Sequence, residues 1–183
     1  MEYGRPVKLP DGRYFLKISD SLLQVNNVKL SDSLTGSSVT FDVPESQQSV
    51  ITAADESILA KAKESKQDWF GKELSDEAIQ NAFQDSLTDG AISASPARLK
   101  GEIVTTAFDS KKASVDLQDV KAGTSCDVLL ELAGLWFLKK SFGPIWRVIQ
   151  VRVRGAARPV FTKEYLFKDS PEDDEPDPAD YLD

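Results

Sequence analysis

The stretch Ser125 to Arg154, "SCDVLLELAGLWFLKKSFGPIWRVIQVRVR", decides the fold, because it predicts the best-defined hairpin of the chain. Residues 128–138 and 145–154 have the length and the β-branched or aromatic content of two paired strands. The segment "KKSFGP" joins them, and its Gly143 and Pro144 are typical turn residues. A long antiparallel hairpin near the C-terminal end is therefore expected.

The side chains of this hairpin indicate contact with another molecule. Alternate residues of a strand face opposite sides, so Ile145 and the odd positions after it predict a core face. The even positions predict a face with Trp146, Gln150, Arg152 and Arg154. Aromatic rings beside cations provide base stacking and phosphate contacts, which together favour single-stranded nucleic acid without sequence readout.

The candidate contacts are the aromatic and basic residues of the hairpin, with three residues of the first strand. They are Trp136, Phe137, Lys139, Lys140, Phe142, Trp146, Arg147, Arg152 and Arg154, joined by Arg13, Tyr14 and Lys17. We expect two of the four aromatic residues between positions 135 and 148 to be buried in the core. Trp69 and Phe70 could form a further stacking platform, but packing against the sheet is the commoner role for such a pair.

The charge of the chain is unevenly distributed. The formal net charge is −8, yet residues 169–183 alone carry eight acids and no base, so residues 1–168 are neutral. Residues 135–168 carry eight bases and one acid. A cationic segment followed by an anionic one is a pattern of nucleic-acid binding with a built-in competitor, although a solvated surface with a solubility tail fits the charge equally well.

Several enzyme classes are excluded by composition. The chain has no histidine and one cysteine, so Ser-His-Asp or Cys-His catalysis, histidine-zinc sites and intrachain disulfides cannot occur. No phosphate-binding glycine loop is present. We expect Cys126 to be a small buried hydrophobe, and we expect no enzymatic activity and no cofactor. No secretory signal or membrane span is evident, which predicts an intracellular protein.

The rest of the chain predicts a mainly β, α+β domain over residues 1–168. Residues 12–18 and 37–43 read as short strands, and residues 97–104 begin a second β block. Between them, apolar residues at helical spacing predict a helical insertion at about 52–89, with a Thr52 cap and a Ser75 cap. Residues 169–183, rich in acids and proline, predict a disordered tail.

These features resemble the OB-fold single-stranded-DNA-binding proteins of phages and large DNA viruses, of the type with an acidic C-terminal tail. The resemblance rests on the architecture, the hairpin "GLWFLKKSFGPIWRVIQVRVR" and the acidic tail that ends in "DYLD". It implies a five-stranded OB-type barrel and a role in DNA replication, recombination or repair. It also implies that the tail recruits partner enzymes through Tyr181 and Leu182 and competes with DNA.

Other readings stay open at this point. An acidic chaperone would bind basic proteins through the tail, and its hairpin would be ordinary core. A metal-dependent nuclease would use carboxylates such as Asp42 and Glu45, although no spacing compels it. The sequence leaves open whether DNA or RNA is bound and whether the chain forms a homodimer.

Overall fold

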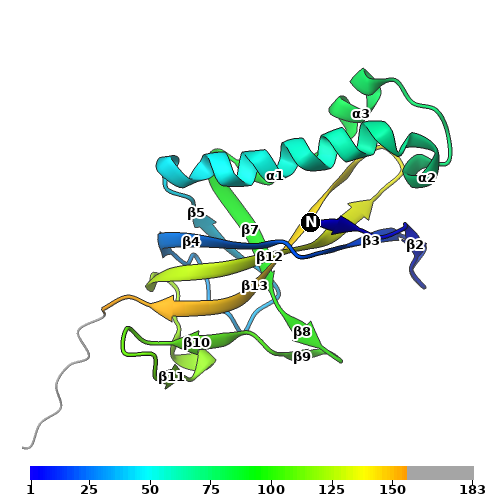
Figure 1. The fold of residues 1–183 in the computed structure, drawn as a ribbon. Helices are drawn as coiled ribbons and strands as arrows, with labels where there is room; N and C mark the ends of the chain where they lie inside the picture. The colour runs from blue at the N-terminus through cyan, green and yellow to red at the C-terminus, as the bar shows by residue number, and fades with distance from the viewer. Residues whose placement is uncertain (156–183) are drawn as a thin grey trace, which may run out of the picture.

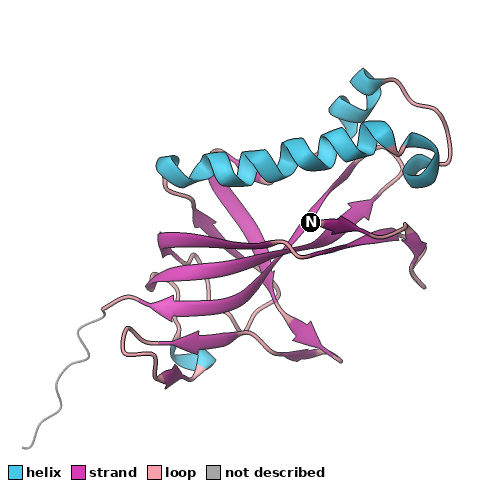
Figure 2. Cartoon of the chain, viewed as in Figure 1, coloured by secondary structure: helices cyan, strands magenta, loops and turns pink. Residues whose placement is uncertain are grey.

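The computed structural model describes residues 1–155, which form a mainly β structure with a few helices (Figures 1 and 2). Residues 156–183, including the predicted tail with Tyr181 and Leu182, lie outside the described residues. The helices are α1 (Glu45–Glu64), α2 (Lys66–Phe70), α3 (Asp76–Ala82) and the 3-10 helix η1 (Leu117–Asp119). The strands are β1 (Glu2–Tyr3), β2 (Val7–Lys8), β3 (Tyr14–Ser19), β4 (Leu22–Lys29), β5 (Val39–Asp42), β6 (Leu87–Thr88), β7 (Ala91–Pro96), β8 (Arg98–Leu99), β9 (Glu102–Ile103), β10 (Thr106–Phe108), β11 (Ser114–Val115), β12 (Ser125–Phe137) and β13 (Phe142–Val153).

The predicted hairpin is confirmed as β12 and β13, which pair antiparallel from Cys126↔Val153 to Phe137↔Phe142. Its turn is Leu138–Ser141, closed by a 2.8 Å hydrogen bond from Leu138 N–H to the Ser141 carbonyl. The prediction that Gly143 and Pro144 form the turn is wrong, because both lie within β13. Gly143 instead makes room for a ring: a Cβ there would lie 2.9 Å from Trp136 Cζ2.

Two irregularities break the simple alternation of faces along the hairpin. The pairing shifts between Leu129 and Leu130 of β12, opposite Ile149, and again between Leu132 and Gly134. Consequently Trp146, Val148 and Val151 are all buried, and the core face changes from even to odd positions at Ile149. The predicted even face is therefore exposed only at its far end, because a bulge moves every later side chain to the opposite side.

The hairpin lies at the centre of the sheet. β12 pairs with β4 along its first half and with β3 along its second half, while β13 pairs in parallel with β7 and β10. β5 pairs with β7, and a backbone hydrogen bond from Ser31 N–H to the Thr40 carbonyl connects the segment that follows β4 to β5 itself. In residues 1–155 the ladder does not close through β4 and β5, so a closed five-stranded barrel is not shown.

The helices α1, α2 and α3 lie on one side of the strands, with α1 running across them, whereas the short 3-10 helix η1 lies at the opposite, lower end (Figure 2). α1 begins at Glu45, directly after Pro44, and not at the predicted Thr52 cap. The predicted cap of α3 is confirmed, since Ala78 N–H donates to Ser75 Oγ at 3.1 Å. The predicted helical insertion ends early, because Leu87 and Thr88 belong to β6.

The core is continuous beneath α1 and around the hairpin. Ile51 and Ile58 of α1 are fully buried with Leu130 and Leu132 of β12. Cys126 is also fully buried, as predicted, and burial followed by the charge of Asp127 raises its pKa to about 12. No helix within residues 1–155 combines the length and apolar character needed to cross a bilayer.

Candidate nucleic-acid interface

A hollow of about 660 Å³ lies where the turn of the hairpin meets α2, α3 and the N-terminal strands. We call it the turn-end hollow. Three separate segments supply most of its wall: the start of β3, the α2–α3 region and the turn itself. Its lining residues are Pro6, Tyr14, Asp68, Trp69, Phe70, Gly71, Lys72, Leu74, Ala78, Ile79, Ala82, Phe137, Leu138, Lys139, Lys140, Ser141 and Phe142.

The floor of the turn-end hollow is a packed aromatic cluster. The rings of Phe137 and Phe142 are stacked, with centroids 5.6 Å apart and planes inclined by 8°. Phe70 meets both rings edge-on, at 5.9 and 5.2 Å, and Trp69 meets Phe137 edge-on at 6.2 Å. Such edge and stacked pairs hold one another in fixed orientations, so the floor is rigid and apolar.

The rim of the turn-end hollow is accessible and carries an aromatic residue. Tyr14 opens β3 beside the hairpin, in register with Phe137, and its side chain is 45% exposed. Leu138 on the turn is 56% exposed. Phe70 is only partly buried, so its ring forms part of both the floor and the wall of the hollow. An exposed ring beside an apolar floor can accept a flat, apolar group such as a nucleobase.

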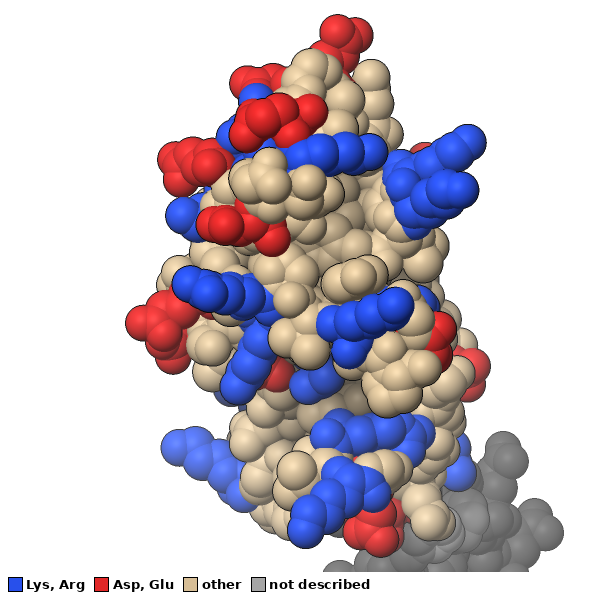
Figure 3. All heavy atoms as spheres, turned by 90° about the vertical axis from the view of Figure 1, so that its right-hand side faces the viewer, with Lys and Arg blue, Asp and Glu red and all other residues tan. Residues whose placement is uncertain are grey.

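The charge of the rim is positive. Lys139 and Lys140 on the turn and Lys72 after α2 are exposed, whereas Asp68 is the only acid among the lining residues. An ion pair of 2.8 Å between Lys66 Nζ and Asp76 Oδ1 links α2 to α3 behind this wall. Figure 3 shows the side of the molecule on the right in Figure 1, where basic side chains are spread over the face and acidic ones gather toward the upper left.

Of the three residues predicted on the first strand, Tyr14 lines the turn-end hollow, whereas Arg13 and Lys17 are not among its lining residues. Lys17 is exposed and pairs in register with Gly134 of β12. Arg13 is exposed and forms an ion pair of 2.6 Å with Asp11. This contact, first through its hydrogen bond and then through its charge, lowers the pKa of Asp11 and raises that of Arg13.

Three of the predicted contact residues are buried. The side chains of Phe137, Phe142 and Trp146 are 8%, 1% and 4% exposed, so they offer no face to a base in this structure. The expected two buried aromatics are in fact three. The lysines and arginines of the hairpin lie on its turn and toward the far end of β13. The high density of Lys and Arg in the sequence therefore did not mean that the neighbouring aromatic rings are exposed.

Trp146 is held by a buried polar chain. Its Nε1–H donates to Ser86 Oγ at 2.8 Å, and Ser86 donates from Oγ and from its backbone to Asp55, at 2.6 and 2.8 Å. Burial raises the pKa of Asp55, although the two Ser86 hydrogen bonds oppose this. The indole nitrogen is therefore satisfied inside the protein, which stabilises the buried position of the ring.

Trp136 lies apart from the turn-end hollow. It is half-buried and lines a second hollow of about 230 Å³, together with Pro144 and Trp146. Trp136, and not Phe137, therefore borders the same space as Trp146. The other walls of this hollow are polar, from residues such as Gln84 and Thr40.

The predicted arginines do not join the turn-end hollow. Arg147 is half-buried in the middle of β13, opposite Glu131. Arg152 and Arg154 are exposed at the other end of the strand, where both contact Asp127. Of the residues predicted to contact nucleic acid, only Tyr14, Lys139 and Lys140 form the accessible rim of one hollow.

Two rim residues were not among the predicted contacts. Phe70 and Lys72 belong to "DWFGK", in which a left-handed Gly71 ends α2 and carries Lys72 to the rim. The signal available in the sequence was the pairing of an aromatic residue with a lysine across a helix-ending glycine. Within residues 1–155, acids and cysteine form no group of three or more suited to hold a metal ion.

Comparison with solved structures finds similar chains, among them three of the single-stranded DNA-binding protein from bacteriophage Enc34. The protein in complex with single-stranded DNA is 12% identical, with a TM-score of 0.49, over 85% of this chain and 97% of that chain. The C-terminal truncation is 14% identical with a TM-score of 0.49, over 81% and 93% of the two chains. A third structure of this phage protein is also 14% identical with a TM-score of 0.49, over 86% and 96% of the two chains.

No curated protein matches the sequence. The model of one protein family matches residues 26–169, which run from within β4 to beyond the end of β13. Because this match covers more than half of the chain, the protein belongs to the family of unknown function DUF5871.

Proposed function

We propose that this protein binds single-stranded DNA without sequence specificity and without catalysing a reaction. The turn-end hollow is the proposed contact surface, with Tyr14 and Phe70 for bases and with Lys72, Lys139 and Lys140 for phosphates. The observation that carries the proposal is the half-exposed Tyr14 on a lysine-rich rim above an apolar aromatic floor.

The chemistry of the turn-end hollow favours a single strand over a duplex. In a duplex the base faces are covered by their neighbours, so an exposed ring has nothing to stack on. In a single strand each base can leave its neighbours, and stacking on an aromatic side chain contributes about 1–3 kcal/mol per base. Because every base has such a face, this contact does not depend on sequence.

The lysines contribute the second part of the proposed binding energy. Each phosphate neutralised by a lysine releases counterions, so the affinity falls as the salt concentration rises. Lys139 and Lys140 lie on a four-residue turn at the tip of the hairpin, where a passing backbone can reach them without entering the core. An open OB-type arrangement of β4, β12, β13, β7 and β5 is the scaffold that we propose for this surface.

The acidic segment extends the proposal to partners. In the sequence its eight acids directly follow a segment of net charge +7, and this covalent linkage raises their effective concentration as competitors for the cations that DNA would use. We propose that it competes with DNA and recruits enzymes of replication, recombination or repair through Tyr181 and Leu182. These two residues are an aromatic and an aliphatic side chain set among carboxylates, which suits a short recognition peptide.

The test is a titration of fluorescent oligo-dT, oligo-U and duplex DNA of equal length at two salt concentrations. The wild-type protein is compared with the double variant Lys139→Ala/Lys140→Ala. We expect the wild type to bind oligo-dT more tightly than duplex DNA. We expect the variant to bind oligo-dT about tenfold more weakly, and the slope of its log affinity against log salt concentration to be smaller by about 1.4.

The matched control is Lys29→Ala/Lys121→Ala, which removes the same charge from exposed positions that line neither the turn-end hollow nor the hollow beside Arg152 at the far end of β13. Lys29 pairs with Ser125, whereas the turn follows Phe137 at the other end of the same strand. We expect this control to bind oligo-dT within about twofold of the wild type. Equal affinity for duplex and oligo-dT, or equal losses in both double variants, would overturn the proposal.

A further inference from the structure

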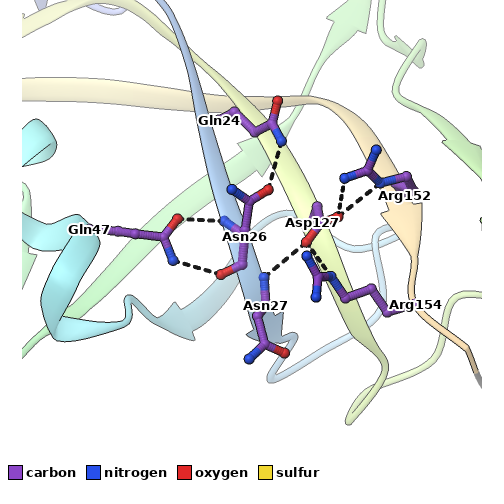
Figure 4. Close-up of polar contacts among 7 residues, drawn as sticks. All are labelled: Gln24, Asn26, Asn27, Gln47, Asp127, Arg152 and Arg154. Carbon is purple, nitrogen blue, oxygen red and sulfur yellow. Dashed lines mark hydrogen bonds and ion pairs between the residues drawn. The ribbon is translucent and has the colours of Figure 1, made fainter.

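The end of the hairpin away from its turn carries a fixed pair of arginines (Figure 4). Asp127 of β12, whose side chain is 4% exposed, accepts from Arg152 Nε at 2.8 Å and from Arg152 Nη2 at 2.5 Å. Its other oxygen accepts from Arg154 Nε at 2.6 Å. One buried carboxylate thus holds two guanidinium groups that are themselves 53% and 48% exposed.

A bulge in the sheet explains why Asp127 is available for this contact. The β12–β4 pairing skips from Cys126↔Val28 to Val128↔Val25, so Asn26 and Asn27 lie opposite Asp127 alone. Asn27 adopts a left-handed backbone, with φ of 57°, and its N–H donates to Asp127 Oδ1 at 2.9 Å. Such a backbone is tolerated by Asn better than by most residues.

The same bulge is fixed from its other side by helix α1. Gln47 accepts from Asn26 N–H at 2.8 Å and donates to the Asn26 carbonyl at 2.9 Å, in the way a neighbouring strand would. Figure 4 shows Gln47 reaching β4 from the helix while Asp127 meets it from the strand. The position of Asp127, and through it that of both arginines, is therefore set by three elements.

The arginines keep donors for an outside ligand. A guanidinium has about five N–H donors, and Asp127 takes two from Arg152 and one from Arg154. Charge-assisted contacts with a planar guanidinium are well suited to phosphate oxygens. Holding the side chains in place before binding reduces the entropy that a ligand would otherwise have to remove.

A hollow of about 240 Å³ lies directly beside Arg152, and we call it the open-end hollow. Phe108 of β10 lines it and is in parallel register with Arg152. Lys112, in the turn after β10, also lines it, as do the amide side chains of Gln24 and Gln150. Its acids are Asp127 and Asp109, and the latter accepts from the backbone of its own turn.

We propose that the open-end hollow is a second subsite for single-stranded DNA, which rests on the function proposed above. One phosphate would lie on Arg152 and Lys112, and its base would stack on the half-buried ring of Phe108. Asp127 acts as a positioning residue that orients the arginines and does not touch the ligand. The subsite lies at the opposite end of β12 from the turn-end hollow, so a strand occupying both would follow the length of the hairpin.

The test uses the full chain with an oligo-dT longer than the upper end of the ~4–16 nucleotides that OB folds cover. Two variants address the open-end hollow, Phe108→Leu and Lys112→Asn. Lys112 has a left-handed φ of 64°, so asparagine removes its charge at little backbone cost. We expect each variant to lose at least about fivefold in affinity, and Lys112→Asn to lower the salt slope by about 0.7.

The matched control is Lys111→Asn, which removes the same charge from the neighbouring residue, outside the lining of the hollow. We expect it to bind as the wild type does. A direct readout is photo-crosslinking with an oligonucleotide that contains bromodeoxyuridine, which we expect to label the peptide carrying Phe108. Thermal midpoints of all variants show whether each one is folded.

The outcomes separate the two proposals. If the wild type and Lys111→Asn bind, Lys139→Ala/Lys140→Ala is weakened, and both open-end variants bind normally without a crosslink at Phe108, the second subsite is overturned alone. If Lys112→Asn and Lys111→Asn weaken binding equally, the effect is general charge and the subsite is likewise overturned. If the wild type binds no oligonucleotide, the proposed function fails, and the subsite fails with it.

Discussion

The two ends of the β12–β13 hairpin present their cations in opposite ways. At the turn, Lys139 and Lys140 are exposed beside a floor of stacked aromatic rings. At the open end, Arg152 and Arg154 are fixed by the buried carboxylate of Asp127. The contrast shows that the cations are supported differently at the two ends of one hairpin: by apolar packing at the turn and by a polar network at the open end.

The largest expected effect comes from breaking the aromatic floor. Phe142 is 1% exposed, so Phe142→Ala should lower the free energy of unfolding by about 3–5 kcal/mol through lost burial and the cavity that it leaves. Leu138→Ala, on the adjacent turn, should change it by less than about 0.5 kcal/mol because Leu138 is largely exposed. Urea denaturation measures both. Similar losses in the two variants would show that the floor is not part of the core.

A smaller effect is expected when the polar network at the open end is broken. Asp127→Asn keeps the shape of the side chain but removes its charge, and should cost about 1–2 kcal/mol because the arginines are about half exposed. This cost should depend on pH. Burial alone would raise the pKa of Asp127, but hydrogen bonds from Asn27, Arg152 and Arg154 outweigh it, so the pKa lies below its usual value.

The sign of that dependence follows from the lowered pKa. The ionised carboxylate stabilises the folded state fully above the unfolded pKa of about 3.9, and this contribution is lost as the pH falls through the lower folded value. Denaturation of wild type and Asp127→Asn should therefore differ at pH 7 and converge in strong acid. A difference that stays constant between pH 7 and pH 2 would mean that the charge of Asp127 contributes nothing.

The smallest expected effect concerns competition between the acidic segment and DNA for the cations at the two ends of the hairpin. Removing residues 169–183 deletes eight acids that follow the cationic segment. The truncated protein should bind oligo-dT several-fold more tightly at low salt and equally at about 0.5 M salt, where screening is strong. Paired fluorescence titrations measure this. Unchanged or weaker binding at low salt would remove the acidic segment as a competitor and favour the solubility or chaperone reading.

Local features of the fold were predictable from the sequence. The hairpin followed from the β-branched and aromatic runs on either side of "KKSFGP", and the Ser75 cap followed from the acids in the first turn of α3. The burial of Cys126 followed from its apolar neighbours. In each case the residues within a few positions determine the outcome, which is why patterns of spacing suffice.

The faces of the hairpin could not be predicted in the same way. Alternation holds only while the register is unbroken, and the irregularities near Ile149 and Ala133 depend on the strands paired alongside. Before the irregularity at Ile149 the even positions Trp146 and Val148 are buried, whereas after it the odd position Val151 is buried and Arg152 and Arg154 are exposed. An extra residue that causes a bulge cannot be recognised from composition, so the sequence could not show that the indole of Trp146 is buried.

The turn-end hollow could not be predicted from the spacing of residues in the sequence either. It is assembled from Tyr14, Phe70 and the turn after Phe137, which are separated by long stretches of sequence. The lysines and the tyrosine were predictable as residue types, but their shared location required the β3–β12 pairing and the placement of α2 against the hairpin. Tertiary pairing, and not local pattern, creates this surface.

The central claim is that bases stack in the turn-end hollow, and one measurement tests it most directly. Wild type, Tyr14→Ala and Tyr14→Phe are titrated with oligo-dT and with an abasic oligonucleotide of the same length and charge. Because stacking on one ring contributes about 1–3 kcal/mol, the wild type should bind oligo-dT at least about fivefold more tightly than the abasic strand. Tyr14→Phe should keep this difference and Tyr14→Ala should lose most of it. Equal binding of the two strands by the wild type, or an undiminished difference in Tyr14→Ala, would contradict the claim.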